Sequence, residues 1–304
     1  MRLITSAIVA LAATLSTALP AAAEEGRHLV FGCICDDTQD LRDRQGLVID
    51  YLATVLSDIP GLKIESARLA DIPSMSDAIN AGKVDFVSET PLAAWAIIDR
   101  TNAEITFRER RHGVISYRSL IVASEKSGVT TLGDLVGKVV AFEGPGSTSA
   151  FLFPLAMLRG EGLQTVELAS PTDPVPAGKV GYIFTHEDGA AARYIADGKA
   201  VAGALSDEDW ASPQIEEPLA RTRMKVISTS EPLLRAVTLV RKDMDPELKA
   251  RLIAALKNMH DDPDGRQALR DYNRVRRFDY ADEAILADME RMRVYYERVK
   301  DRVG

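Results

Sequence analysis

The chain has 304 residues, of which 46% are hydrophobic and 27% are charged, and its formal net charge is −8. This composition is that of a globular protein rather than a disordered one, and the negative charge argues against nucleic acid or an anionic membrane as a partner. A chain of this length exceeds the usual size of a single hydrophobic core, so we expect two lobes.

The first 23 residues have the organisation of a secretory signal peptide. Arg2 supplies a positive charge, residues 3–19 are apolar or small, and residues 21–23 are alanines that offer a cleavage site. A membrane anchor is the alternative, but this apolar run is short for a span, and no later segment is apolar enough to cross a membrane. We therefore expect a periplasmic protein with no membrane insertion after cleavage.

The mature chain alternates short apolar runs with amphipathic helical patterns, as in βαβ units. The first part predicts strands at 28–34, 63–68 and 84–88, helices at 46–56, 74–80 and 92–100, and a β-rich run at 114–124 that suits a crossing between lobes. The rest predicts strands at 138–142, 180–185, 201–205, 225–230 and 235–240, and helices from 147 and at 189–197, 248–259 and 281–299. We expect a first lobe of 24–114 plus 233–304 and a second lobe of 115–232.

The segment 141–151 carries the clearest functional signal. An apolar strand ends at glycines and restarts as a helix whose first turn contains Ser147, Thr148 and Ser149. A helix N-terminus has unpaired N–H groups and a partial positive charge, so it can bind an oxyanion, and hydroxyls add further donors. The alternative is an ordinary helix cap after a Gly-Pro-Gly turn.

The stretch 146–154 resembles the strand-to-helix signature of substrate-binding subunits of ABC importers for phosphonate, phosphite and phosphate. The resemblance extends along the mature chain through residues 81–86, 117–119, 185–188, 198–207 and 262–265. It implies an α/β fold, a two-lobe type II periplasmic binding protein clamshell with two crossing strands, which closes over one oxyanion. The implied partner is an ABC permease.

The remaining site candidates follow predicted strands, since ligands of open α/β sheets bind beyond the carboxyl ends of strands. His186 lies where the family places a histidine and could donate a charge-assisted bond, or it is a surface or capping imidazole. Glu89 and Thr90 open a first-lobe helix, and Ser206 and Asp207 follow a second-lobe strand.

The two carboxylates suit a ligand that carries a proton. Glu89 or Asp207 could accept a hydrogen bond from the P–OH of a phosphate-type ligand or from an ammonium group on a phosphonate, which ionised sulfate does not offer. The alternative is that each carboxylate is solvated or caps a helix. Tyr117 either donates its phenol or packs at the hinge, and Arg235 either closes on the anion or is a surface group.

Cys33 and Cys35 lie at the end of the first predicted strand. Alternate strand residues point the same way with Cα atoms near the upper end of the disulfide range, so a bond between them would be strained, and we expect two thiols able to bind a thiophilic ion. Proteins similar to this family include arsenite-sensing periplasmic proteins that present a cysteine to a membrane histidine kinase. The alternatives are small buried residues or a strained redox pair.

Three classes of function follow. The leading hypothesis is a solute-binding protein that captures phosphonate, phosphite or phosphate for an ABC importer. The second is a sensor that binds arsenite or a similar species through the cysteines and signals to a histidine kinase. An enzyme is not expected, because the histidines lack metal-ligand spacing and no nucleophile or nucleotide motif is present. We expect no cofactor and a monomer; a neighbouring permease gene would favour transport, and a kinase gene would favour sensing.

Overall fold

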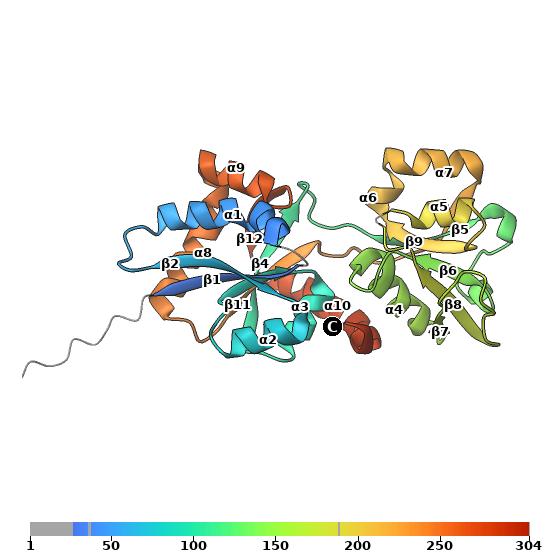
Figure 1. Ribbon diagram of the computed structural model, residues 1–304, viewed down its shortest axis with the longest axis horizontal. Helices are drawn as coiled ribbons and strands as arrows, with labels where there is room; N and C mark the ends of the chain where they lie inside the picture. The colour runs from blue at the N-terminus through green and yellow to red at the C-terminus, as the bar shows by residue number, and fades with distance from the viewer. Residues whose placement is uncertain (1–26, 36–37, 188, 304) are drawn as a thin grey trace, which may run out of the picture.

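The computed structural model describes residues 27–35, 38–187 and 189–303 and forms two lobes side by side, each built on a six-stranded sheet (Figure 1). The strand order is β12-β4-β11-β3-β1-β2 in one sheet and β10-β5-β9-β6-β8-β7 in the other. This confirms the predicted α/β clamshell. The proposed signal peptide, residues 1–23, lies outside the described residues.

The elements of the first sheet come from both ends of the chain. They are β1 (His28–Ile34), α1 (Thr38–Val55), β2 (Lys63–Leu69), α2 (Ile72–Asn80), β3 (Phe86–Glu89), α3 (Pro91–Ile98), β4 (Ala103–Arg111), β11 (Ala236–Arg241), α8 (Pro246–Asn258), η5 (Met259–Asp261), α9 (Pro263–Asp271), β12 (Val275–Tyr280), α10 (Glu283–Val299) and η6 (Lys300–Arg302). The chain therefore leaves this lobe after β4 and returns at β11.

The second sheet is built from one continuous stretch. Its elements are β5 (Ser119–Ser124), η1 (Glu125–Ser127), η2 (Gly133–Leu135), β6 (Val139–Phe142), the π-helix η3 (Thr148–Leu152), α4 (Phe153–Gly160), β7 (Gln164–Glu167), β8 (Lys179–Phe184), α5 (Ala191–Ala196), β9 (Ala202–Ser206), α6 (Asp207–Trp210), η4 (Pro213–Ile215), α7 (Glu216–Arg221) and β10 (Met224–Thr229). Two segments, 112–118 and 230–235, connect the lobes.

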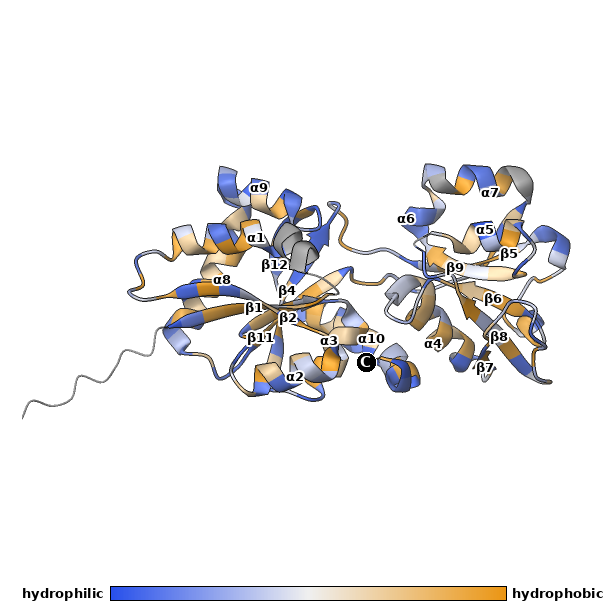
Figure 2. Ribbon diagram, viewed as in Figure 1, coloured by the Kyte–Doolittle hydropathy of each residue, from blue (hydrophilic) through white to orange (hydrophobic). Residues whose placement is uncertain are grey.

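Each sheet contains a group of neighbouring parallel strands, and this places the loops that follow those strands at one edge. β1 pairs in parallel with β2 and β3, and β6 pairs in parallel with β8 and β9. The crossing segments pair with one another, since Tyr117 and Leu233 exchange backbone hydrogen bonds of 3.0 and 2.8 Å. In Figure 2 the central strands of both sheets are mainly hydrophobic, whereas α9 carries many hydrophilic residues.

The C-terminal helix forms a third link between the lobes that the sequence did not predict. α10 packs against α3 of the first lobe and α4 of the second, and Trp95 Nε1 donates a hydrogen bond of 2.9 Å to the Met289 carbonyl. Beyond α10, Arg302 donates to Glu167 at 2.7 Å. Figure 1 shows the C-terminus between the two lobes. One buried cluster, which includes Trp95 and Phe153, therefore joins both lobes.

Several predicted element boundaries require correction. The helix expected at 74–80 begins at Ile72, because Asp71 is its N-cap and Ser74 completes a capping box from the third position. β4, β7, α6, α7, α9 and β12 were not predicted. Among the residues that the structure describes, no helix is both long enough and apolar enough to span a bilayer.

Candidate functional site

The topology of the second lobe collects its predicted site residues at one edge of the sheet. The Ser147–149 turn follows β6, His186 follows β8, and Ser206 is the last residue of β9. Tyr117 belongs to the same edge, because it precedes β5, which runs antiparallel to β9 with Ser119 opposite Ser206. This edge is where open α/β sheets bind ligands.

The start of η3 contains a buried hydroxyl without a partner. Ser147 is the N-cap, and its Oγ accepts a hydrogen bond of 3.2 Å from the N–H of Ala150. Thr148 is only 5% exposed, and its Oγ1 has no hydrogen-bond partner among the described residues. An unsatisfied buried hydroxyl costs about 1–3 kcal/mol, and short π-helical turns occur often at functional sites. The Thr148 hydroxyl is therefore a buried group whose hydrogen-bonding capacity is not used within the described residues.

Ser149 lies against Tyr117 of the crossing segment and Ser119 at the start of β5. Its carbonyl accepts a hydrogen bond of 2.5 Å from Ser119 Oγ, and its side chain lies close enough to the Tyr117 phenol to lower the pKa of that phenol, against the larger opposite effect of burial. Tyr117 is buried, and burial raises the pKa of its phenol, so the phenol is neutral. Tyr117 thus packs at the hinge and also lies beside the η3 turn, and donation of its phenol to a ligand stays a prediction.

His186 lies at the expected edge but its side chain is exposed. Its backbone N–H donates to the Glu143 carbonyl at 2.7 Å, and its φ of 53° lies in the left-handed region, which non-glycine residues rarely adopt. The imidazole ring lies 5.8 Å from the ring of Phe184. His186 is therefore positioned beside the η3 turn by the strand pairing of β6 and β8.

Ser206 and Asp207 are both engaged in local structure. The Ser206 hydroxyl donates to Asp209 Oδ2 at 2.6 Å and accepts from the Asp209 N–H at 3.0 Å, which makes a capping box for α6. Asp207 Oδ1 accepts from the Arg118 N–H at 2.9 Å. The Ser206 bonds are those of a helix cap and the Asp207 bond holds the crossing segment, so neither residue is carried into the ligand set proposed below.

In the first lobe, Glu89 and Thr90 line a cavity of about 170 Å³ at the carboxyl ends of β1 and β3. The other residues around this first-lobe cavity are Gly32, Cys33, Ile34, Gln45, Ser88, Arg111, Tyr272 and Asn273. Gln45 donates through Nε2 to the Gly32 carbonyl at 2.9 Å, but its buried Oε1 has no partner among the described residues. The cavity therefore offers a free acceptor as well as a carboxyl group.

The groups around the first-lobe cavity shift the pKa of Glu89 in opposite directions. Burial raises the pKa of Glu89 to about 7, although Arg111 and the Thr90 N–H favour its charged form, and Glu109 adds to the rise. Arg111 donates through Nε to Glu109 Oε2 at 2.9 Å. Near neutral pH, Glu89 can therefore either donate or accept a proton. Sequence reasoning missed Arg111 because it missed β4.

Cys33 and Cys35 are joined by a disulfide, which corrects the expectation of two free thiols. Their Cα atoms are 5.6 Å apart, close to the most common separation in disulfides rather than near its upper limit. Cys33 lines the first-lobe cavity. In the described parts of the chain, no three His, Cys, Asp or Glu side chains gather as a metal site would require.

A larger cavity of about 720 Å³ lies at the crossing segments and is lined by residues of both lobes, including His112, Arg274, Glu208 and Arg235. Arg235 stacks over the Tyr117 ring at 4.7 Å and contacts Glu208 Oε2 at 2.8 Å. Its buried Nε has no partner among the described residues. Arg235 is therefore a cation at the hinge whose Nε–H makes no hydrogen bond within the described residues.

Comparison with known proteins places this geometry in context. A family model described as the periplasmic substrate-binding protein of phosphonate ABC transporters matches residues 31–285. The phosphate-import protein PhnD of Mycolicibacterium smegmatis is 28% identical over 209 residues, which are 67% of this chain and 64% of that protein. The match thus spans less than two thirds of that relative's length.

Solved structures support the fold. XAC2383 from Xanthomonas citri, in structures bound to chloride ion and to ATP, has a TM-score of 0.81 with 27% and 26% identity, over 91% of this chain and 99% of that chain. PhnD1 from Prochlorococcus marinus (MIT 9301), in complex with methylphosphonate, has a TM-score of 0.62 and 17% identity, over 91% of this chain and 100% of that chain. At that identity, PhnD1 supports the fold alone.

Proposed function

Because this chain belongs to the family of phosphonate ABC transporter periplasmic substrate-binding proteins, we propose that it captures a phosphate-type oxyanion and presents it to an ABC permease. The family is one of periplasmic transport binding proteins, so we infer that the chain acts in the periplasm. Phosphonate, phosphite and phosphate are the candidate ligands. XAC2383 is known bound to ATP and PhnD1 bound to methylphosphonate, so the ligand of this chain must be measured.

The observation that carries the proposal is the unpartnered Thr148 hydroxyl at the start of η3. It is buried beside the backbone N–H groups of a helical first turn, where an oxyanion is stabilised by hydrogen bonds and by the helix dipole. Ser147 and Ser149 flank it, and His186 lies at the same sheet edge. These four residues form the second-lobe half of the proposed site.

The first lobe supplies the other half through Glu89, Thr90 and Arg111, which line one cavity. The two halves belong to different lobes, so a ligand that contacts both favours the closed arrangement of the lobes. A Glu89 carboxyl with a pKa of about 7 can exchange a hydrogen bond with a P–OH group. Fully ionised sulfate has no such proton, so the proposed site discriminates against sulfate.

The sensor alternative depended on two free thiols at Cys33 and Cys35. A disulfide has no thiolate to offer to arsenite or to a thiophilic ion, and the structure joins the two sulfur atoms. We therefore do not propose the sensor function.

Titration calorimetry on the mature protein tests the proposal with phosphate, phosphite, methylphosphonate, 2-aminoethylphosphonate, sulfate and ATP. The informative variant is Thr148→Val, which keeps the side-chain shape and removes the hydroxyl; Thr229→Val, on the exposed side of β10, is the matched control. We expect one of the phosphorus compounds to bind, and Thr148→Val to weaken binding about tenfold, the effect of one lost hydrogen bond to a charged group. Equal affinity in the two variants would reject the η3 site.

A further inference from the structure

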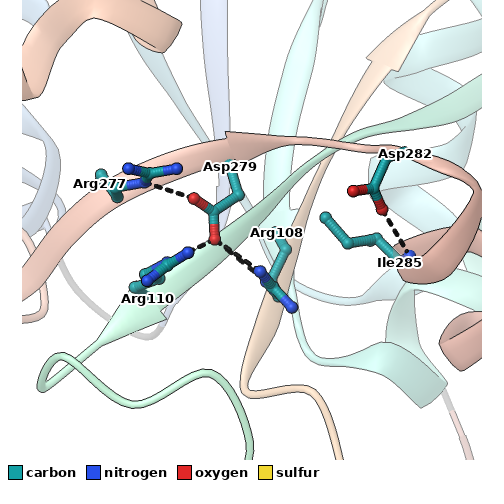
Figure 3. Close-up of polar contacts among 6 residues, drawn as sticks. All are labelled: Arg108, Arg110, Arg277, Asp279, Asp282 and Ile285. Carbon is teal, nitrogen blue, oxygen red and sulfur yellow. Dashed lines mark hydrogen bonds and ion pairs between the residues drawn. The ribbon is translucent and has the colours of Figure 1, made fainter.

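The outer edge of the first-lobe sheet carries an arginine cluster that the proposed cleft does not use (Figure 3). We use the term arginine cluster for Arg108 and Arg110 of β4 together with Arg277 and Asp279 of the edge strand β12. Asp279 Oδ2 accepts hydrogen bonds from Arg108 Nη2 at 2.7 Å and from Arg110 Nε at 2.5 Å. Its Oδ1 accepts from Arg277 Nε. Three guanidinium groups thus share one carboxylate.

Strand register explains why these side chains meet. Asp279 lies directly opposite Arg108 in the antiparallel pair. Side chains two residues apart on a strand share a face, so Arg110 joins Arg108, and Arg277 joins Asp279. The register of β12 shifts between Val275 and Phe278, and such irregularities often re-aim side chains near functional sites.

The arginine cluster lines a cavity of about 430 Å³, a size typical of small-molecule sites. Lys257 adds another cation, and His260 contributes a buried Nδ1 that has no partner within the described chain. Two further carboxylates line the cavity. One of them, Asp282, accepts from the Ile285 N–H at 2.9 Å and so caps α10, and the other, Asp261, is largely exposed.

The arginine cluster contains N–H donors that its carboxylate does not use. A guanidinium has five N–H groups, whereas Arg110 and Arg277 each contact Asp279 through Nε, and their terminal Nη groups have no hydrogen-bond partner in the described residues. Their side chains are 33% and 44% exposed. Burial alone would raise the pKa of Asp279, but hydrogen bonds from the three arginines hold it below its usual value. The carboxylate is therefore ionised, and the cluster retains two positive charges.

We propose that this cavity is a second anion site, separate from the inter-lobe cleft, that takes a polyvalent phosphate-type oxyanion such as inorganic pyrophosphate. The planar forks of Arg110 and Arg277 suit two-pronged recognition of phosphate oxygens, which a lysine does not provide. Counted together with Lys257, Asp261 and Asp282, the residues that line the cavity leave one net positive charge, so the preference for a polyvalent oxyanion rests on the number of guanidinium donors rather than on charge. The site lies on the first lobe alone, so it does not depend on lobe closure or on the proposed function.

Calorimetry with inorganic pyrophosphate at constant ionic strength tests the site. The variant is Arg110→Gln/Arg277→Gln, which removes the exposed arginines and leaves the Arg108–Asp279 pair. The control is Arg270→Gln/Arg276→Gln, which removes the same charge from exposed positions that do not line the cavity. We expect the control to bind like the unmodified protein and the variant to lose at least tenfold in affinity at one site. Equal affinities in variant and control would overturn the proposal.

A second measurement needs no variant at the site. The Arg Nε–H signals in ¹⁵N spectra of the Thr148→Val protein, in which cleft binding is weakened, report directly on each guanidinium. We expect pyrophosphate to shift the signals of Arg110 and Arg277 and to leave that of Arg270 in place, with smaller shifts for chloride. Absence of a shift at Arg110 and Arg277 under saturating pyrophosphate would reject the site even if the double variant failed to fold. If the Arg110 and Arg277 signals shift with an acidic peptide but not with pyrophosphate, the proposed ligand class is rejected.

Discussion

Arg111 Nε donates a hydrogen bond of 2.9 Å to Oε2 of Glu109, a carboxylate that is completely buried. The other carboxylate oxygen, Oε1, accepts from the Thr238 hydroxyl at 3.3 Å. Arg111 therefore reaches the first-lobe cavity from a fixed position, beside Glu89. This arrangement sets the charge of the cavity, because a cation and a carboxyl with a pKa of about 7 face the same small volume.

Breaking the Arg111–Glu109 pair should destabilise the first lobe. Arg111→Met leaves Glu109 buried without its cation, and such losses cost about 3–5 kcal/mol. The double variant Arg111→Met/Glu109→Leu should recover most of the lost stability, because no uncompensated buried charge remains. Urea unfolding of the single and double variants measures both effects. A single variant as stable as the unmodified protein would show that Arg111 does not compensate Glu109.

Glu89 should make stability fall as pH rises. Its pKa is raised from 4.5 to about 7 in the folded protein, so between these values the folded state binds more protons than the unfolded state. The free energy of unfolding therefore decreases from pH 4.5 to 7, by an amount on the order of 2 kcal/mol. Denaturant unfolding between pH 5 and 8 should show this slope, and Glu89→Gln should reduce it. An identical slope in Glu89→Gln would contradict the assignment.

Asp207 should act on the crossing segment rather than on the ligand. Its Oδ1 accepts from the Arg118 N–H, and Asn retains an oxygen for that bond. We expect Asp207→Asn to keep both stability and ligand affinity, and Asp207→Ala to lose about 1–2 kcal/mol of stability. Calorimetric binding and thermal unfolding of both variants separate the roles. A large loss of affinity in Asp207→Asn would return this carboxylate to the ligand site.

The disulfide predicts how the protein responds to arsenite. Protein isolated without reductant should contain no titratable thiol, because Cys33 and Cys35 are joined. Arsenite should then fail to bind, and binding should appear only after reduction with a phosphine. Thiol titration and calorimetry on the two forms check this. Arsenite binding by the oxidised protein would require a site other than the cysteines.

Local sequence was a good guide wherever apolar residues are contiguous. β1 was predicted with the bounds that it has, His28–Ile34, because a buried central strand needs an uninterrupted apolar run. β4 was missed, since its last residues, FRERR, are mainly charged. Its charges are accommodated by partners distant in sequence, as when Arg108 meets Asp279. No local pattern can reveal such compensation.

The sequence by itself determined the hydroxyl-rich turn at Ser147, Thr148 and Ser149 and the alternation of strands and helices, because helix starts and apolar periodicity are local properties. Only the tertiary structure decided which polar groups remain unpartnered. It brought the Arg118 N–H into a hydrogen bond with the Asp207 carboxylate and left the Thr148 hydroxyl without a hydrogen-bond partner in the described residues. Whether a buried polar atom is satisfied depends on chain segments that meet only when the sheets assemble, and that pairing decides which groups are left for a ligand.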